Sequence, residues 1–346
     1  MPPRARVTIS DVAREAGVSK GLVSFALNGR AGVSAESRER ILAAADALGW
    51  TPDLRGRALS TGRSYACGLV LGRSADVIAA DPFFPSFIAG IEDEFAVTGQ
   101  VLVLAVASPG GDEAAAYRRL VADNRIDGAL LADLRRDDDR LPLLAELGLE
   151  AVTLGVPDAP SPFSSVAVDD GVGIRLAVDH LVSLGHRDIA HIAGPDGMLH
   201  ARRRREAFEQ AASSAGVRAR VITTDFTAAD GARATAELIE TADRPTGIVY
   251  ANDQMAIAGM GVATRRGLRV PTDLSLTGYD DTELGRHLNP ALTSVATDSR
   301  QWGTLAARAL LARLDGGEVT HIDLPQPTLS IRESTGPASP RAADRG

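Results

Sequence analysis

The chain has 346 residues, 45% of them hydrophobic and 24% charged, and a formal net charge of −8 at pH 7. This length accommodates a small domain and a body of about 280 residues, which usually means two lobes. A single cysteine excludes an internal disulfide and any zinc site built from several cysteines. No segment approaches the roughly 18 apolar residues of a membrane span, and no apolar run follows the N-terminal arginines, so we expect a cytoplasmic protein.

Two short helices around a four-residue turn are predicted at the start of the chain. Thr8, followed three residues later by Asp11, has the spacing of a capping box, and apolar residues recur at helical spacing until Gly17. Ser19 is placed to cap a second helix. The residues of that helix expected to face inward are Leu22, Val23, Ala26 and Leu27. Its outer face is predicted to carry Lys20, Gly21, Ser24, Phe25 and Asn28.

A third helix is predicted from near Ser34 to Leu48, with Gly49 ending it. The apolar positions expected to complete a small core are Ile41, Leu42, Ala45 and Leu48. This arrangement is typical of helix-turn-helix domains, in which the second helix enters the major groove of DNA. Any three short amphipathic helices with glycine turns would give a similar pattern, so the pattern alone leaves a purely structural interpretation open.

Charge is distributed unevenly along the chain. Residues 1–65 contain ten Lys and Arg against six Asp and Glu, so this segment has a net charge of +4 and the remainder −12. A basic head on an acidic body confines attraction to phosphate to one end. Ordinary variation in surface charge is the alternative explanation.

Three segments follow one another in the first sixty or so residues: TISDVAREAGVS, VSAESRERILAAADALGW and TPDLRGRALSTGRS. Through these segments the chain resembles the LacI/GalR family of bacterial transcription regulators. The resemblance implies a helix-turn-helix domain over residues 1–50 and a hinge helix within residues 51–64. It also implies that Leu59 wedges into a central base step of the minor groove and kinks the DNA. Gly56 disfavours the hinge helix by about 1 kcal/mol relative to alanine, so we expect this helix to fold only on DNA.

The second helix departs from the family pattern at two positions. Gly21 stands where a base-contacting side chain is common, and Phe25 where many members have arginine. Lys20 could reach guanine and Phe25 a thymine methyl group, but Gly21 has no side chain to offer, so the operator sequence cannot be read. The expected DNA-binding residues are Thr8, Ser19, Lys20, Gly21, Ser24, Phe25, Asn28, Arg55, Arg57 and Leu59.

Beyond Ser64, short apolar runs alternate with helical stretches, which predicts parallel sheets with helices on both faces. The predicted strands are 66–71, 101–106, 128–132, 151–154, 166–168, 188–192, 221–224, 247–250 and 274–277. The family resemblance implies an α/β body over residues 65–335 that is similar to periplasmic binding proteins of type I, with two lobes and ligand held between them. One lobe would take about 65–165 and a return near 298–324. Residues 336–346 are predicted to form a disordered tail. This tail lacks the leucine heptads that would bundle two dimers, so we expect a homodimer.

Ligands collect at the carboxyl ends of strands in open parallel sheets, and four segments near such ends match the family's cleft. They are DPFF at 81–84, the arginine run at 202–205, NDQM at 252–255 and GYDD at 278–281. The resemblance makes Asp280 an acceptor of ligand hydroxyls and selects Arg204 by its register with Ala207 and Phe208. The expected effector-binding residues are Asp81, Phe83, Phe84, Arg204, Asn252, Asp280 and Trp302. Core packing of the aromatic residues and helix capping by Asn252 are the structural alternatives.

Catalysis is not expected. No G-x-G-x-x-G follows the first strand, and neither G-x-S-x-G nor H-E-x-x-H occurs. The six histidines are scattered, so no metal site or cofactor is predicted, and His186 and His191 are interpreted as structural. We therefore expect a regulator whose partners are a pseudo-palindromic DNA operator and a small effector, a sugar before a nucleoside. The alternatives are a purine-dependent corepressor mechanism and a solute-binding module without a regulatory role.

Overall fold

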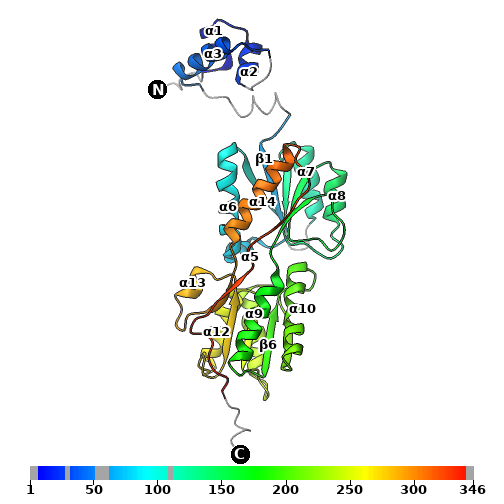
Figure 1. Ribbon diagram of the computed structural model, residues 1–346, viewed down its shortest axis with the longest axis vertical. Helices are drawn as coiled ribbons and strands as arrows, with labels where there is room; N and C mark the ends of the chain where they lie inside the picture. The colour runs from blue at the N-terminus through cyan, green and yellow to red at the C-terminus, as the bar shows by residue number, and fades with distance from the viewer. Residues whose placement is uncertain (1–6, 28–31, 51–61, 108–111, 340–346) are drawn as a thin grey trace, which may run out of the picture. The chain divides into compact units, whose positions relative to one another are not determined.

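A computed structural model of the chain describes residues 7–27, 32–50, 62–107 and 112–339. The chain forms two compact units, Met1–Tyr65 and Ala66–Gly346, which we call the head and the body. In the head, the described helices are α1 (Ile9–Glu15), α2 (Lys20–Leu27) and α3 (Ala35–Ala47) (Figure 1). These are the three helices that the sequence predicts.

Local capping explains where these helices begin. The Thr8 backbone N–H donates to Asp11 Oδ2 at 2.9 Å, which confirms the capping box at the start of α1. The Leu22 N–H donates to Ser19 Oγ at 3.2 Å at the start of α2. Ser34 caps α3 through the Ser37 N–H at 3.2 Å. A side-chain oxygen therefore satisfies a backbone donor at the start of each helix: a carboxylate at α1 and a serine hydroxyl at α2 and α3.

The core of the head contains Val12, Val23 and Ile41, none of them exposed to solvent. The prediction for Leu42 is wrong, because its side chain is 49% exposed and Ala44 is buried instead. Residues of a helix are rotated by 100° per position, so a residue directly after Ile41 points away from the face that Ile41 shares with Ala44.

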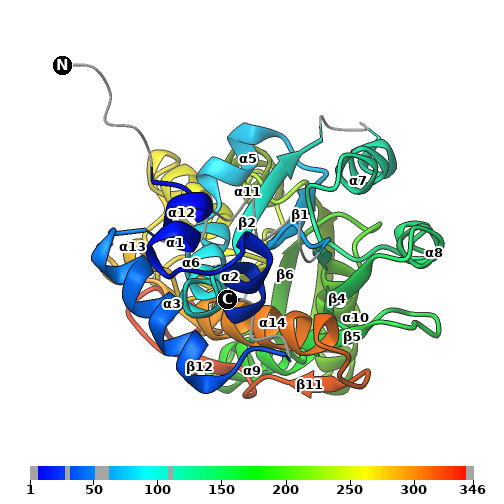
Figure 2. The ribbon, with the colours of Figure 1, turned by 90° about the horizontal axis from the view of Figure 1, so that it is seen from above.

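The first lobe of the body is a six-stranded sheet in which every described strand pairing is parallel. In sheet order its strands are β11 (His321–Asp323), β5 (Ser164–Ala167), β4 (Glu150–Leu154), β3 (Gly128–Leu131), β1 (Ala66–Leu71) and β2 (Val101–Val106). Its helices are α5 (Ala75–Ala80), α6 (Phe83–Thr98), α7 (Glu113–Ala122), α8 (Arg140–Glu146) and α14 (Ser299–Leu314). Figure 2 shows α7 and α8 on the side of the sheet away from α6 and α14.

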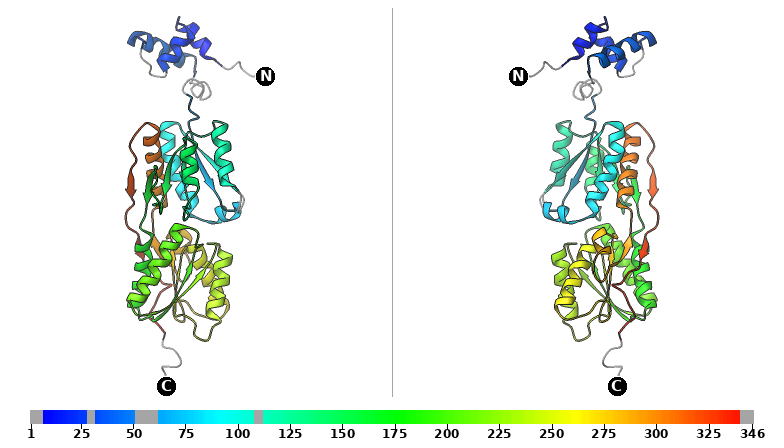
Figure 3. Two further views of the ribbon diagram at one scale, coloured as in Figure 1. Left: turned by 90° about the vertical axis from the view of Figure 1, so that its right-hand side faces the viewer. Right: turned by 90° about the vertical axis from the view of Figure 1, so that its left-hand side faces the viewer.

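The second lobe repeats this architecture (Figure 3). In sheet order its strands are β12 (Thr328–Ser330), β10 (Thr293–Ala296), β9 (Ser275–Tyr279), β8 (Gly247–Tyr250), β6 (Asp188–Ala193) and β7 (Arg218–Thr223). Its helices are α9 (Asp170–Ser183), α10 (Leu199–Ser214), α11 (Ala228–Ile239), α12 (Asp253–Arg265) and α13 (Glu283–Arg286). The edge strand β12 is antiparallel to β10.

All nine predicted strands exist, although β7 begins at Arg218, three residues earlier than predicted. The strands β10, β11 and β12 were not predicted, because they are short or polar and form by pairing with longer neighbours. β12 returns the chain to the second lobe, so the described chain crosses between the lobes three times: after β5, after β10 and after β11. The predicted disordered tail is wrong for residues 336–339, since the Ala338 N–H donates to the Leu184 carbonyl at 2.9 Å. Residues 340–346 lie outside the described residues.

His191 is buried in β6 with none of its surface exposed, and its Nδ1 lies 2.8 Å from the Val249 carbonyl oxygen. Its ring stacks on Phe208 at 5.1 Å between centroids. Desolvation by burial lowers the pKa of His191 to about 4, although the hydrogen bond to Val249 opposes the shift. The imidazole is therefore neutral at pH 7 and has the structural role that the sequence suggests.

Acid should destabilise the body through His191. Since the folded-state pKa lies below the unfolded value of about 6.5, the unfolded chain takes up the proton first, and stability falls as pH drops from about 6.5 to about 4. The pKa shift of His191 corresponds to a loss of about 3 kcal/mol in the free energy of unfolding. In His191→Asn, where an amide replaces Nδ1, this component of the loss should disappear, as measured by urea unfolding of both proteins across that pH range. Parallel pH curves for the two proteins would contradict the prediction.

Candidate functional site

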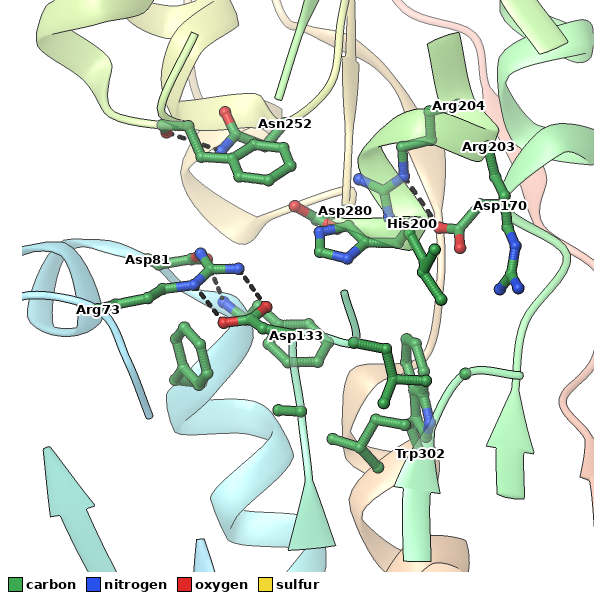
Figure 4. A pocket seen from close by; sticks show the side chains of 18 residues that line it. Arg73, Asp81, Asp133, Asp170, His200, Arg203, Arg204, Asn252, Asp280 and Trp302 are labelled. Carbon is green, nitrogen blue, oxygen red and sulfur yellow. Dashed lines mark hydrogen bonds and ion pairs between the residues drawn. The ribbon is translucent and has the colours of Figure 1, made fainter. Parts of the chain in front are cut away.

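A cavity lies between the two lobes of the body, where the carboxyl ends of strands from both sheets meet (Figure 4). All seven residues that the sequence singles out for an effector line it: Asp81, Phe83, Phe84, Arg204, Asn252, Asp280 and Trp302. Other lining residues were not predicted, including Arg73, Asp133, His200, Arg203 and Phe226. Polar side chains from both lobes therefore converge on one space.

Asp280 follows β9 directly and has a φ of 103°. A positive φ is costly for a residue other than glycine, and such strain concentrates at binding sites. The Asp280 backbone N–H donates to the Val295 carbonyl at 2.8 Å, while its carboxylate accepts no hydrogen bond from any residue that the structure describes. Burial raises the pKa of Asp280 well above its usual value, and the nearby Arg204 opposes the shift. A ligand hydroxyl donating to this carboxylate would favour its charged form.

Arg204 is anchored within the second lobe. Its Nε and Nη2 donate to Asp170 Oδ1 at 2.9 and 2.7 Å, and its Nη1 donates to the Ala251 carbonyl at 2.8 Å. The guanidinium carbon lies 3.6 Å from the ring centroid of Tyr279. With 7% of its surface exposed, Arg204 presents an edge to the cavity while its charge is balanced by Asp170.

The other arginines of the run on α10 divide into two groups. Arg202 and Arg205 are paired with Glu206 and Glu209 one turn along the helix, as expected for an exposed face. Arg203, which the sequence does not single out, lines the cavity, and its Nη2 donates to the Val156 carbonyl at 2.5 Å. The first turns of α10 face the other lobe, so the neighbouring residues Arg203 and Arg204 both lie toward the cavity.

The structural alternatives for Asn252 and Trp302 are also realised. Asn252 Oδ1 accepts from the Met255 N–H at 2.9 Å and its Nδ2 donates to the Phe226 carbonyl at 3.0 Å, so its polar atoms are already engaged. The Trp302 Nε1 donates to the Val166 carbonyl at 2.9 Å, and the Trp302 ring meets Phe83 edge-on at 5.8 Å between centroids. These side chains shape the cavity wall while they stabilise the lobes.

Asp81 and His200 differ in whether their polar atoms are already hydrogen-bonded within the protein. Asp81 is 8% exposed and its Oδ1 accepts from the Phe83 N–H at 3.0 Å; burial raises its pKa and Arg73 opposes the shift. His200 stacks on Phe226 at 5.4 Å between centroids, and desolvation lowers the pKa of His200 to about 4. It is therefore neutral at pH 7, with one donor and one acceptor nitrogen. Within the described ranges, neither nitrogen is hydrogen-bonded.

In the head, α2 exposes the side predicted to read DNA. Phe25 is 42% exposed, and Lys20 and Gly21 lie on the same exposed side. The hydroxyls of Thr8 and Ser19 are used in helix capping. The predicted contacts Asn28, Arg55, Arg57 and Leu59 lie outside the described residues.

The described residues contain no group of three or more His, Cys, Asp or Glu side chains that could hold a metal ion. Across the same ranges, each helix is too short or too polar to span a bilayer.

Two family models match the chain. The model described as "Bacterial regulatory proteins, lacI family" matches residues 8–53, and the one described as "Periplasmic binding protein-like domain" matches residues 178–335. The HTH-type transcriptional regulator CelR of Thermobifida fusca is 34% identical over 345 residues, covering 96% of this chain and 100% of that protein. The HTH-type transcriptional repressor PurR of Photobacterium profundum is 30% identical over 332 residues, covering 94% and 98%.

Solved structures of transcriptional regulators are similar to this chain over nearly its whole length. A transcriptional regulator CelR–cellobiose complex is 33% identical with a TM-score of 0.73, covering 95% of this chain and 100% of that one. The lac repressor dimer bound to operator and the anti-inducer ONPF is 30% identical with a TM-score of 0.80, covering 96% and 100%.

Proposed function

The chain belongs to the lacI family of bacterial regulatory proteins, and from that premise we propose that it is a repressor whose operator affinity is switched by an uncharged sugar bound between the lobes. It is a DNA-binding transcriptional regulator with a small-molecule effector. The identity of the effector, the residues that hold it and the assembly on DNA are the finer parts of the proposal.

The observation that carries the sugar assignment is that the unengaged Asp280 carboxylate and the neutral His200 line the same cavity. Together they offer acceptors and a donor for hydroxyl groups, and Phe83 and Trp302 supply apolar surface for the C–H faces of a sugar ring. The charges of Arg73 and Arg204 are already balanced by Asp133 and Asp170. Among the described cavity-lining arginines, only Arg203 is not paired with a carboxylate, so a phosphate or carboxylate group would find a single counter-charge in the cavity. A CelR relative has been solved as a cellobiose complex, which supports a sugar for this chain too.

Effector binding would change the angle between the lobes and thereby the spacing of the two hinge segments in a dimer. We expect a coupling free energy on the order of 1–3 kcal/mol, which is about a 5- to 150-fold change in operator affinity.

Leu59→Ala should weaken operator binding about 10- to 150-fold, because truncating a wedged leucine removes about 1.5–3 kcal/mol of apolar contact in the minor groove. The effector affinity of the variant should equal that of the parent, since the substitution leaves the cavity untouched. Fluorescence anisotropy with a labelled operator would measure the first quantity and calorimetry the second. Equal operator affinity in parent and variant would contradict the insertion of Leu59 into the minor groove.

A homodimer on a pseudo-palindromic operator is proposed for the assembly. The strand β2 supports it, since it lies at an edge of its sheet and exposes Val101, Leu104 and Val106 by 44–49%. An exposed apolar edge strand is a surface that soluble proteins usually cover.

Leu104→Asp should therefore convert dimers to monomers, because a carboxylate would be buried without a partner in the interface. Val319→Asp, at a 50% exposed residue just before β11, is the matched control and should leave the dimer intact. Analytical ultracentrifugation across a dilution series measures both. An unchanged dimer in Leu104→Asp would place the interface elsewhere.

The experiment that tests the function as a whole is selection of bound DNA from a random-sequence pool, repeated with a panel of sugars and nucleosides. A palindrome that is depleted by a sugar supports the proposal. Enrichment by a purine or nucleoside would instead support a corepressor mechanism, and no enrichment in any condition would support a solute-binding module without a regulatory role. We propose further that the protein catalyses no reaction, needs no cofactor and acts on chromosomal DNA in the cytoplasm, as regulators of this family do.

A further inference from the structure

Aromatic rings from both lobes lie against the guanidinium group of Arg73. Its guanidinium carbon is 5.3 Å from the ring centroid of Phe84 in the first lobe and 5.5 Å from that of Phe226 in the second. The two rings are buried, with 2% and 3% of each residue exposed. A cation facing aromatic rings is held more strongly when it is desolvated. We call the space that Arg73 fills against these two rings the aromatic slot.

Phe226 is fixed in an unusual conformation. Its φ is 71°, a left-handed value that a bulky residue adopts only when its surroundings impose it. The Phe226 carbonyl accepts from the side-chain amides of Asn252 at 3.0 Å and Gln254 at 2.8 Å. A Cβ atom at Gly194 would come within 2.1 Å of the Phe226 ring, so only glycine leaves room for it there. The ring is therefore a rigid wall of the cavity.

Arg73 is equally constrained. Its Nε and Nη2 donate to the two carboxylate oxygens of Asp133 at 2.6 Å each, in the bidentate geometry that suits a planar guanidinium. Burial would raise the pKa of Asp133, but the ion pair with Arg73 prevails and lowers it to about 2. The Asp133 carbonyl in turn accepts from Arg140 Nη2 at 2.8 Å. Arg73 is thus held in place by the first lobe.

The same corner of the cavity joins the lobes. Arg73 Nη2 lies 3.8 Å from Met198 Sδ, and the Leu199 N–H donates to the Leu134 carbonyl at 2.8 Å. Residues 198 and 199 belong to the second lobe and residue 134 to the first. Displacing Arg73 would therefore break its ion pairs with Asp133 and Asp81, two ring contacts and part of the junction between the lobes.

We propose that Arg73 is a specificity-determining clasp. It keeps the aromatic slot filled by the chain itself, ties Phe84 to Phe226 across the cleft, and excludes flat aromatic ligands such as nucleobases. The cavity beside Asp280 and His200 is left to a polyhydroxy ligand. The exclusion of nucleobases rests on the proposed function, whereas the clasp can be measured without any effector.

The test uses Arg73→Ala in a Trp50→Phe background, where Trp302 in the cavity wall is the remaining tryptophan. Loss of the clasp should lower the Tm by on the order of 5–10 °C and make Trp302 more accessible to acrylamide quenching. Millimolar methylguanidinium should restore both values in Arg73→Ala, because it can pair with Asp133 and fill the aromatic slot. It should leave the Arg73 parent unchanged.

Arg203→Ala is the matched control, since it removes another cavity-lining arginine that contacts a backbone carbonyl. Unchanged Trp302 quenching in Arg73→Ala, or equal rescue of Arg203→Ala, would overturn the clasp. Should Arg73→Ala fail to fold, Phe226→Leu provides a second test, because leucine keeps apolar bulk at this position but has no ring face for Arg73. This variant should raise the acrylamide quenching of Trp302 and should not respond to methylguanidinium. Quenching equal to that of the parent would likewise overturn the clasp. Tight binding of adenosine by the parent would overturn the exclusion of nucleobases and leave the clasp result standing.

Discussion

Asp280→Asn is expected to raise the effector Kd by about 10- to 150-fold and to leave operator affinity without effector unchanged. The carboxylate can accept two charge-assisted hydrogen bonds from hydroxyl groups, each stronger than a neutral bond, and an amide retains only one weaker acceptor. The factor corresponds to about 1.5–3 kcal/mol. Asparagine tolerates a positive φ, so the backbone around Asp280 should keep its conformation.

Calorimetric titration with the effector that the selection experiment identifies, together with operator anisotropy, measures both quantities. Asp196→Asn provides the control, because it makes the same charge change in the same lobe at an exposed carboxylate paired with Arg205. It should leave both affinities unaltered. If Asp280→Asn bound effector as tightly as the parent, another residue would have to be the acceptor.

Arg140→Leu is expected to cost about 3–5 kcal/mol of the free energy of unfolding. Arg140 is 2% exposed, and it donates to Glu113 Oε1 at 2.9 Å and to Asp138 Oδ1 and Oδ2 at 2.8 and 2.6 Å. Its removal would leave the buried Asp138 carboxylate without its cation and Glu113 with Arg135 alone, which costs more than the lost packing. The loss should be measured by urea unfolding at pH 7.

The defect should shrink in acid. Burial would raise the pKa of Asp138, but its bonds to Arg140 lower it below 3.8, so this stabilisation is present above that pH and is lost as pH falls through the folded-state pKa. Arg233→Leu, which removes an exposed pair with Asp230, is the control and should change stability little. Equal losses in the two variants, or a loss in Arg140→Leu that does not change with pH, would show that packing rather than charge is responsible.

The head could be predicted because its signals are local. Thr8, Ser19 and Ser34 stand at the helix starts, and apolar spacing identifies the buried faces. The central strands of the body were equally clear, since apolar residues dominate each of them. β10, β11 and β12 carry no such run and depend on partners that lie far away in the chain, so their positions follow from tertiary pairing.

The residues of the candidate site likewise divide into those that local sequence identifies and those that it does not. Asp280 directly follows β9 and Asn252 lies two residues after β8, both strands that the sequence identifies, so their placement at the sheet ends follows from topology. Arg73 was missed because its partner Asp133 is sixty residues away, so nothing nearby in the sequence marks it. Phe226 was missed because its importance lies in a left-handed backbone and a facing glycine, which residue type and spacing do not reveal.

The three crossings between the lobes have a mechanical consequence. Three covalent segments that bridge the same two bodies resist sliding and separation, and the softest remaining motion is a rotation about the axis that they define. The amplitude of that rotation can depend on the bound molecule, but its direction is built into the chain. Mutations lining the cavity can therefore change which effector is bound while the direction of the lobe rotation stays the same.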